Sequence, residues 1–243
     1  MQPVKIPVGG VEMNGNLFLS PKIEGKVPAI LHIHGWQSAQ DRGFEISKLL
    51  AAMGFICLTF DMRGHGREEK SPGELDKLSR KDFLDDVIAA YDFIAKQDGV
   101  DREDISVVGS SFGSYLAALL TKERKVSRLV LRVPADYPDE GFETPNVETF
   151  EKSEGDGWWE KTKEWKETAA LRALHEFRGP ILLIESEKDE DIPPQTIKNY
   201  RNAVEEEGQV TYVLMKDAPH SLRDRPDLQR ELEKIVVDWM INK

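Results

Sequence analysis

The sequence contains only one cysteine, Cys57, among its 243 residues, which excludes a disulfide within the chain and favours a reducing compartment. It has no apolar run near the roughly 20 residues that a helix needs to cross a bilayer. Its first residues, MQPVKIPVGG, lack the basic and apolar regions of a secretory signal. We therefore expect a cytoplasmic protein with no membrane partner.

Clustered positive charge is also missing. The chain has 33 lysines and arginines against 44 aspartates and glutamates, a formal net charge of −11, and the two signs are interspersed. Because binding to a phosphate backbone requires clustered positive charge, we expect no nucleic-acid partner. His32 and His34 form an H-x-H pair, but no cysteine or carboxylate cluster accompanies them, so we expect no metal site. Nothing in the sequence indicates another cofactor.

What the chain does have is a regular alternation of two patterns. Short apolar or β-branched runs predict strands at 3–8, 11–20, 27–35, 55–61, 104–109, 127–134, 179–186 and 209–215. Segments of helical period follow most of them, at 44–54, 79–97, 112–122, 193–208 and 227–241. The alternation predicts an α/β fold, with a mostly parallel central sheet of about eight strands flanked by helices. Gly9 and Gly10 predict an antiparallel hairpin at its start.

One stretch breaks the alternation. Residues 134–176 contain no strand pattern, begin as a loop and continue into the helical-looking GWWEKTKEWKETAALRALHEF. We interpret 134–176 as a small helical cap, inserted into one domain whose core comprises 1–133 and 177–243. Its aromatic residues Tyr137, Trp158 and Trp159 could line a substrate pocket, or could hold the cap to the core. His175, on the charged helix of this cap, is expected to be solvated.

Chemically useful side chains follow several strands at the carboxyl edge, where parallel sheets bind ligands. Ser111, Asp189 and His220 occur there in that order. A serine hydroxyl needs a base to become a nucleophile, histidine can carry the proton near neutral pH, and a carboxylate can orient the imidazole. Asp136, Glu187 and Asp191 are alternatives for the acid, although we expect Asp191 to cap the helix that begins with two prolines.

Ser111 lies in GSSFG, between a predicted strand and a predicted helix. Gly109 and Gly113 are expected because a side chain at either position would clash where strand and helix pack closely. Ser110 occupies the variable position of the pattern and is expected to face into the fold. The start of the following helix offers free N–H groups and a positive dipole end, which favour developing negative charge.

Five segments in the expected order make the chain resemble the α/β-hydrolase superfamily, and in particular its serine esterases, dienelactone-hydrolase-like enzymes and small-lid carboxylesterases. The segments are IHGW, DMRGHG, GSSFG, ESEKDEDIP and DAPHSL. The resemblance implies a catalytic triad of Ser111, His220 and Asp189. It also implies an oxyanion hole made by the backbone N–H groups of Trp36 and Phe112. The last segment has Pro219 where the family usually has glycine.

The resemblance further implies a serine hydrolase of the carboxylesterase type, acting through an acyl-enzyme on small to medium acyl or aryl esters. The expected partner is thus a small-molecule ester, and both a monomer and a homodimer are open. The Trp36 indole is a further pocket candidate, and His34 is expected to order the oxyanion loop. A thioesterase or a peptidase on the same scaffold, or a non-catalytic ligand-binding protein, are the alternatives.

Overall fold

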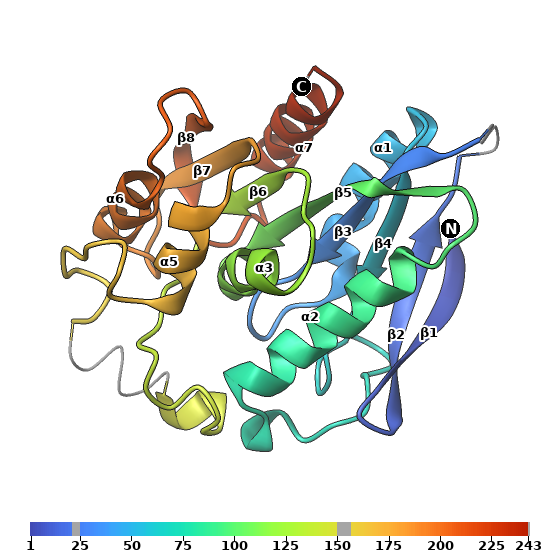
Figure 1. Cartoon of the computed structure of the whole chain (residues 1–243), viewed down its shortest axis with the longest axis horizontal. Helices are drawn as coiled ribbons and strands as arrows, with labels where there is room; N and C mark the ends of the chain where they lie inside the picture. The colour runs from blue at the N-terminus through green and yellow to red at the C-terminus, as the bar shows by residue number, and fades with distance from the viewer. Residues whose placement is uncertain (21–24, 150–156, 243) are drawn as a thin grey trace.

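The computed structural model describes residues 1–20, 25–149 and 157–242 and contains all eight strands that the sequence predicts (Figure 1). The strands are β1 (Gln2–Val8), β2 (Val11–Phe18), β3 (Val27–Ile33), β4 (Ile56–Phe60), β5 (Val100–Ser110), β6 (Leu129–Arg132), β7 (Ile181–Lys188) and β8 (Val210–Pro219). They form one sheet in the order β1-β2-β4-β3-β5-β6-β7-β8. The predicted fold class is confirmed.

One strand, β2, runs opposite to all the others in the sheet. β1 and β2 pair antiparallel through the predicted turn at Gly9 and Gly10, whose φ angles are +54° and +84°. β2 is also antiparallel to β4, and from β4 to β8 every neighbouring pair is parallel. The carboxyl ends of the parallel strands therefore meet at one edge, which is where the sequence places its reactive side chains.

Helices cover both faces of this sheet. They are η1 (Gln40–Gly43), α1 (Phe44–Ala52), η2 (Leu75–Lys77), α2 (Arg80–Ile94), α3 (Phe112–Glu123), α5 (Ala169–Glu176), α6 (Pro194–Ala203) and α7 (Pro226–Ile241). At the start of α2, Ser79 forms a capping box with Asp82, which stabilises the first turn. In the described part of the chain, no helix combines the length and the apolar character that a membrane crossing requires.

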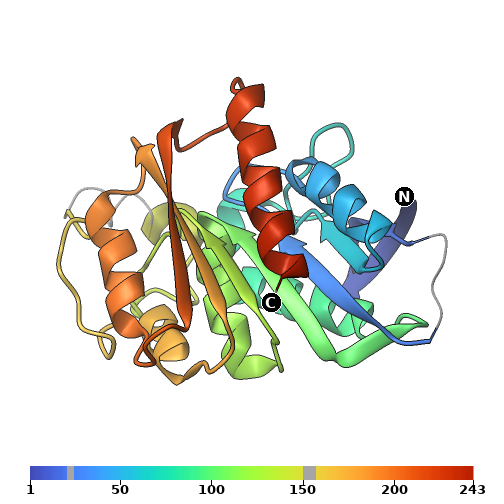
Figure 2. The ribbon, with the colours of Figure 1, turned by 90° about the horizontal axis from the view of Figure 1, so that it is seen from above.

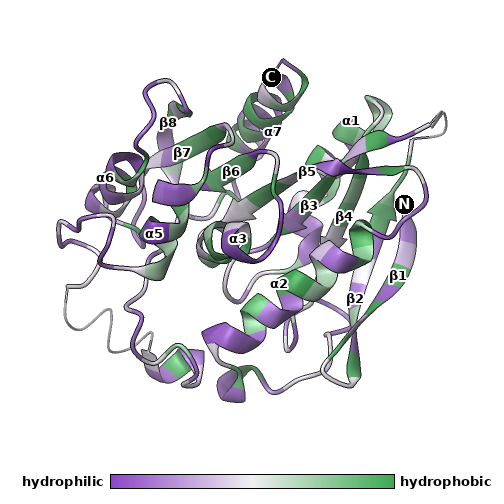
Figure 3. Cartoon of the chain, viewed as in Figure 1, coloured by the Kyte–Doolittle hydropathy of each residue, from purple (hydrophilic) through white to green (hydrophobic). Residues whose placement is uncertain are grey.

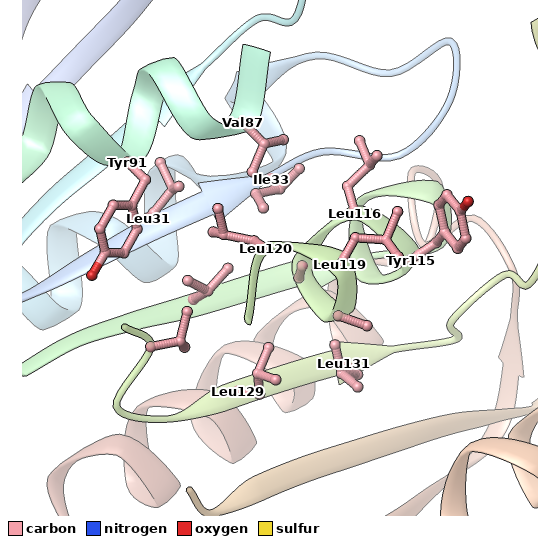
Figure 4. Close-up of a cluster of buried hydrophobic side chains, with 14 of the residues drawn as sticks. Leu31, Ile33, Val87, Tyr91, Tyr115, Leu116, Leu119, Leu120, Leu129 and Leu131 are labelled. Carbon is pink, nitrogen blue, oxygen red and sulfur yellow. The ribbon is translucent and has the colours of Figure 1, made fainter. Parts of the chain in front are cut away.

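The core has two layers, because alternate residues of a strand point to opposite faces. On β3, Leu31 and Ile33 pack toward α2 and α3, whereas Ile30 packs toward α1 and α7. Figure 4 shows the first layer, with Leu116 and Leu120 of α3 between the strands and α2. Figure 2 shows α7 and α1 across the other face, and Figure 3 shows apolar strands between helices with mixed faces. Cys57 is buried in the second layer.

The helical prediction for 157–177 is largely wrong. Only α5 is helical there, and it begins where Thr168 caps it by accepting the N–H of Leu171. Its apolar side packs against α3 in the main core. His175 is half-buried rather than solvated, because its ring stacks on Trp165 with centroids 3.8 Å apart and Nδ1 contacts the carbonyl of Ala203 at 3.0 Å. Residues 150–156 of the predicted cap lie outside the described residues, and the cap itself stays a prediction.

Candidate active site

Ser111 sits on a sharp turn between β5 and α3, with φ of +53° and ψ of −119°. Glycine is required on both sides of it. A Cβ atom on Gly109 would lie 2.5 Å from the carbonyl oxygen of Gly113, and one on Gly113 would lie 2.6 Å from the carbonyl oxygen of His34. Both obstacles are backbone atoms that cannot move aside without displacing a strand. The close packing of strand and helix therefore holds Ser111 in a conformation that L-residues rarely adopt.

The structure brings together Ser111, His220 and Asp189, although they are far apart in the sequence. Nε2 of His220 lies 3.1 Å from Oγ of Ser111. Nδ1 of the same ring lies 2.9 Å from each carboxylate oxygen of Asp189. If the Nδ1 proton is donated to Asp189, then Nε2 is an acceptor directed at the serine hydroxyl.

Asp189 is fixed by the turn that it begins. Its Oδ1 atom accepts the backbone N–H groups of Asp191 and Ile192, at 3.0 and 2.7 Å, and its side chain is almost fully buried. The expectation that Asp191 caps α6 is wrong, because Pro193 occupies the cap position and no side chain bonds the helix end. The Asp191 carboxylate instead lies 3.7 Å from Nε2 of His220 and is itself exposed to solvent.

The other alternative acid, Asp136, is engaged elsewhere. It is fully buried after β6, where its carboxylate lies 3.7 Å from Nζ of Lys163. Burial raises the pKa of Asp136 to about 6, although Lys163 favours the ionised form. Lys163 also donates to the carbonyl of Trp158, so the pair ties the 158–163 segment to the end of β6. Of Asp136, Asp189 and Asp191, only Asp189 is hydrogen-bonded to Nδ1 of His220.

The two expected oxyanion donors come from segments that adjoin Ser111. Phe112 begins α3, so its N–H belongs to the first turn, where backbone donors have no partner within the helix. A Cβ atom on Gly35 would lie 3.4 Å from Cβ of Ser111, which places the turn of Gly35 and Trp36 directly against the serine.

Two neutral histidines order that turn. Nε2 of His34 accepts the N–H of Met62 at 3.1 Å, so its Nδ1 carries the proton and donates to the carbonyl of Gly35 at 2.7 Å. His65 accepts the N–H of Gln37 in the same way, at 3.2 Å. Burial lowers the pKa of His34 to about 3 and that of His65 to about 4. No three His, Cys, Asp or Glu side chains of the described residues are grouped to hold a metal.

Arg132 is a residue of this site that sequence reasoning missed. It ends β6 and is 93% buried, since only 7% of its surface is exposed. Its guanidinium donates to the carbonyl of His220 at 2.7 Å, to Ser186 Oγ at 3.2 Å and to Ser110 Oγ at 3.3 Å. Arg132 thereby fixes the His220 loop to the sheet. A charged residue at the end of an otherwise apolar strand was the signal available in the sequence.

A cavity of about 620 Å³ opens over Ser111 and His220. Three of the predicted pocket residues, Trp36, Tyr137 and Trp159, line it. Trp158 does not line it. The Trp158 ring packs instead against the ammonium of Lys163, which lies 4.4 Å from the ring centroid. The cavity is large enough for a small organic ligand, and the arrangement beneath it can activate a hydroxyl toward a carbonyl carbon.

The chain resembles known proteins in both sequence and structure. Residues 43–243 match the model of the prolyl oligopeptidase family. Among solved structures, the chain resembles Est1E from Butyrivibrio proteoclasticus with ferulic acid bound, with a TM-score of 0.73 and 17% identity over 98% of both chains. It also resembles the acylaminoacyl peptidase of Pyrococcus horikoshii, with a TM-score of 0.70 and 18% identity over 100% of this chain and 41% of that one. At these identities the likeness shows the fold alone.

Among curated proteins, the uncharacterized peptidase YuxL of Bacillus subtilis (strain 168) is 25% identical over 229 residues, covering 88% of this chain and 34% of YuxL. The curated relatives are longer proteins, of which the match spans between 23% and 52%. The family model, in contrast, covers most of the present chain. With the eight-stranded sheet and the turn at Ser111, these matches show that the chain belongs to the prolyl oligopeptidase family, within the α/β-hydrolase superfamily.

Proposed function

We propose that this hydrolase cleaves carboxylic esters of small to medium acyl or aryl groups through an acyl-enzyme on Ser111. The observation that carries the proposal is the hydrogen-bonded series from Ser111 Oγ through His220 to Asp189, with steps of 3.1 and 2.9 Å. The cavity above it and the likeness to Est1E, a protein solved with ferulic acid bound, support a small acyl or aryl substrate.

The proposed reaction begins with attack on the ester carbonyl. Ser111 Oγ forms a bond to the carbonyl carbon while Nε2 of His220 takes the hydroxyl proton. The negative charge moves to the carbonyl oxygen, where the N–H groups of Trp36 and Phe112 stabilise it. Each such donor contributes roughly 3–4 kcal/mol in comparable sites. Asp189 stabilises the imidazolium by accepting its Nδ1 proton in a hydrogen bond.

The intermediate then collapses, and the bond to the alcohol oxygen breaks. His220 returns its proton to this oxygen, so a neutral alcohol leaves and the acyl group remains on Ser111. In the second half, His220 takes a proton from water while the water oxygen attacks the acyl carbon. The Ser111–acyl bond breaks, the serine oxygen is reprotonated, and the carboxylic acid is released.

A fluorophosphonate probe tests the proposal directly, because it phosphonylates an activated serine and spares an ordinary one. We expect the folded protein to be labelled at Ser111 and the Ser111→Ala variant to be unlabelled. A panel of p-nitrophenyl esters should be hydrolysed by the native protein before labelling, and neither by the labelled protein nor by Ser111→Ala. Ser110→Ala is the matched control, since Ser110 faces Arg132 rather than His220. A native protein that is not labelled at Ser111 would rule the proposal out.

Peptide cleavage is the second candidate, favoured by the prolyl oligopeptidase family model over residues 43–243. The same groups can act on an amide, but the leaving nitrogen must receive its proton from His220 before it can depart. Matched aminoacyl p-nitroanilides and p-nitrophenyl esters separate the two functions. An esterase should cleave the anilide more slowly than the ester by far more than the difference in their chemical reactivity explains. Acylation of Ser111 at comparable rates by the two substrates would favour the peptidase.

A further inference from the structure

The cavity over Ser111 continues past the end of the sheet onto its α1–α7 face. The strand register explains its floor, because His32 pairs with Val108, Val108 with Val130, and Ser110 with Arg132. All five side chains point toward α1 and α7 and line the cavity. The walls are apolar and come from Ile46, Leu222, Leu232 and Val236. We call this part, floor and walls together, the α1–α7 lobe.

Two polar atoms in the floor lack hydrogen-bond partners within the described residues: Nε of Arg132 and Nδ1 of His32. Each residue is only 7% exposed, so solvent compensates little for the missing bonds. Arg132 also forms no ion pair with any described carboxylate within 4.0 Å, although the negative charge of Asp189 lies close enough to raise the pKa of Arg132. A buried guanidinium without a paired carboxylate is costly and calls for an explanation.

The charges of the floor can be assigned. Burial lowers the pKa of His32 to about 4, so this ring is neutral at pH 7, whereas Arg132, with its pKa lowered by burial to about 10, keeps its charge. The floor is therefore positive.

The rim of the cavity carries both signs. Its charged residues are Asp41, Arg42, Glu45, Asp191, Arg223 and Glu233. Asp41 is paired with Arg67 and Glu45 with Lys48, and both pairs are exposed to solvent. Five of these six side chains are exposed, so their charges are screened, whereas Glu233 is half-buried and lies near Glu45. Arg132 is the most deeply buried of the charged residues that line the cavity, so we expect it to have the largest effect on which ligands bind in the lobe.

We propose that the α1–α7 lobe is a subsite for an apolar arm that ends in a carboxylate, with the carboxylate directed at Arg132. The ligand would supply the acceptor that the floor lacks, and the apolar walls would cover the arm. Resting on the proposed function, the inference names the substrate class as esters that carry a second, free carboxylate, such as monoesters of dicarboxylic acids.

Binding to the inactive Ser111→Ala protein tests the inference without requiring turnover. Calorimetry would compare monomethyl succinate, adipate and suberate with the corresponding dimethyl esters, which have the same chain but no charge. We expect the monomethyl ester to bind at least about tenfold more tightly for at least one chain length. Arg132→Met should abolish this preference, and Arg132→Lys should retain part of it.

A second variant tests the location. In Ser111→Ala protein, Leu232→Trp should fill the lobe from α7 and weaken binding of the monomethyl ester by at least about tenfold. Lys234→Trp places the same side chain on the exposed side of α7 and should leave binding unchanged. Circular dichroism checks that each variant is folded.

The outcomes separate the two proposals. The proposed carboxylate subsite would be overturned by any of three results, even if the fluorophosphonate labels Ser111. These are no binding of the monoesters, equal affinity for monoester and diester at every chain length, and tight binding of the monoester in Leu232→Trp. Selective binding without any labelling of Ser111 would overturn the esterase and leave the carboxylate subsite standing.

Discussion

Nδ1 of His220 lies 2.9 Å from both carboxylate oxygens of Asp189, whereas the nearby carboxylate of Asp191 lies on the other side of the ring, 3.7 Å from Nε2. Asp189→Asn should lower kcat for ester hydrolysis by roughly 10⁴-fold, because an amide no longer holds the tautomer that leaves Nε2 free. Asp191→Asn should cost less than about tenfold, since Asp191 is exposed and makes no bond to Nδ1. Steady-state kinetics on one p-nitrophenyl ester compares them. The reverse order of effects would show that the acid is Asp191.

Arg132 should act on turnover through the His220 loop, because it donates to the carbonyl of His220 at 2.7 Å. For a neutral ester, Arg132→Met should lower kcat by at least about tenfold with little change in KM, as expected when a catalytic base is misplaced. Arg132→Lys should recover part of the loss by replacing one donor. Urea unfolding monitors the stability of both variants. A folded Arg132→Met enzyme with normal kcat would contradict this role.

Two glycines should differ sharply in their tolerance of alanine. At Gly113 a Cβ atom meets the backbone oxygen of His34 at 2.6 Å, so Gly113→Ala should lower the free energy of unfolding by at least about 3 kcal/mol. Gly208 has a positive φ, +83°, but nothing lies within 4 Å of its added Cβ. Gly208→Ala should therefore cost only about 1 kcal/mol of conformational strain. Urea titration measures both, and similar costs would refute the steric explanation.

His65 should make the fold sensitive to acid. Its folded pKa is lowered to about 4 by burial, below the ordinary value of 6.5, so its contribution is complete above pH 6.5 and is lost as the pH falls toward 4. His65→Gln can still accept the N–H of Gln37 but cannot titrate. The stability advantage of the native protein over this variant should shrink by up to about 1.4 kcal/mol per pH unit in that range. Urea unfolding at pH 7, 6 and 5 measures it, and a constant difference would contradict the prediction.

The buried pair of Lys163 and Asp136 should be costly to break mainly at neutral and alkaline pH. Lys163→Met leaves Asp136 without its cation, and should cost about 3–5 kcal/mol at pH 8, where the carboxylate is ionised. In the native protein burial raises the pKa of Asp136 to about 6, and loss of Lys163 should raise it further, so the cost should fall as the pH drops from 8 toward 6 and the variant's carboxyl is protonated. Asp136→Asn in the same protein should restore much of the stability. A loss independent of pH would point to packing alone.

Much of the site could be predicted from the sequence because its signals are local. The strand before Ser111, the helix after it and the glycines at 109 and 113 are contiguous, and steric conflict within that short stretch decides the turn. The sequence pattern that marks the end of each strand is equally local, so Asp189 and His220 could be assigned to the same edge of the sheet. The helix expected across 157–168 is absent because backbone groups of this segment bond to side chains of α6: the N–H of Lys163 donates to Asn199, and the carbonyl of Trp159 accepts from Thr196.

The sequence by itself therefore determined the strand and helix alternation and the turn that presents Ser111, since these depend on residues a few positions apart. Only the tertiary structure decided that Asp189 rather than Asp136 is bonded to His220, and that Arg132 reaches beneath the His220 loop into the α1–α7 lobe. The reason is physical: backbone periodicity and sterics act along the chain, whereas hydrogen bonds between side chains act across space. Their partners are set by how strands and loops pack.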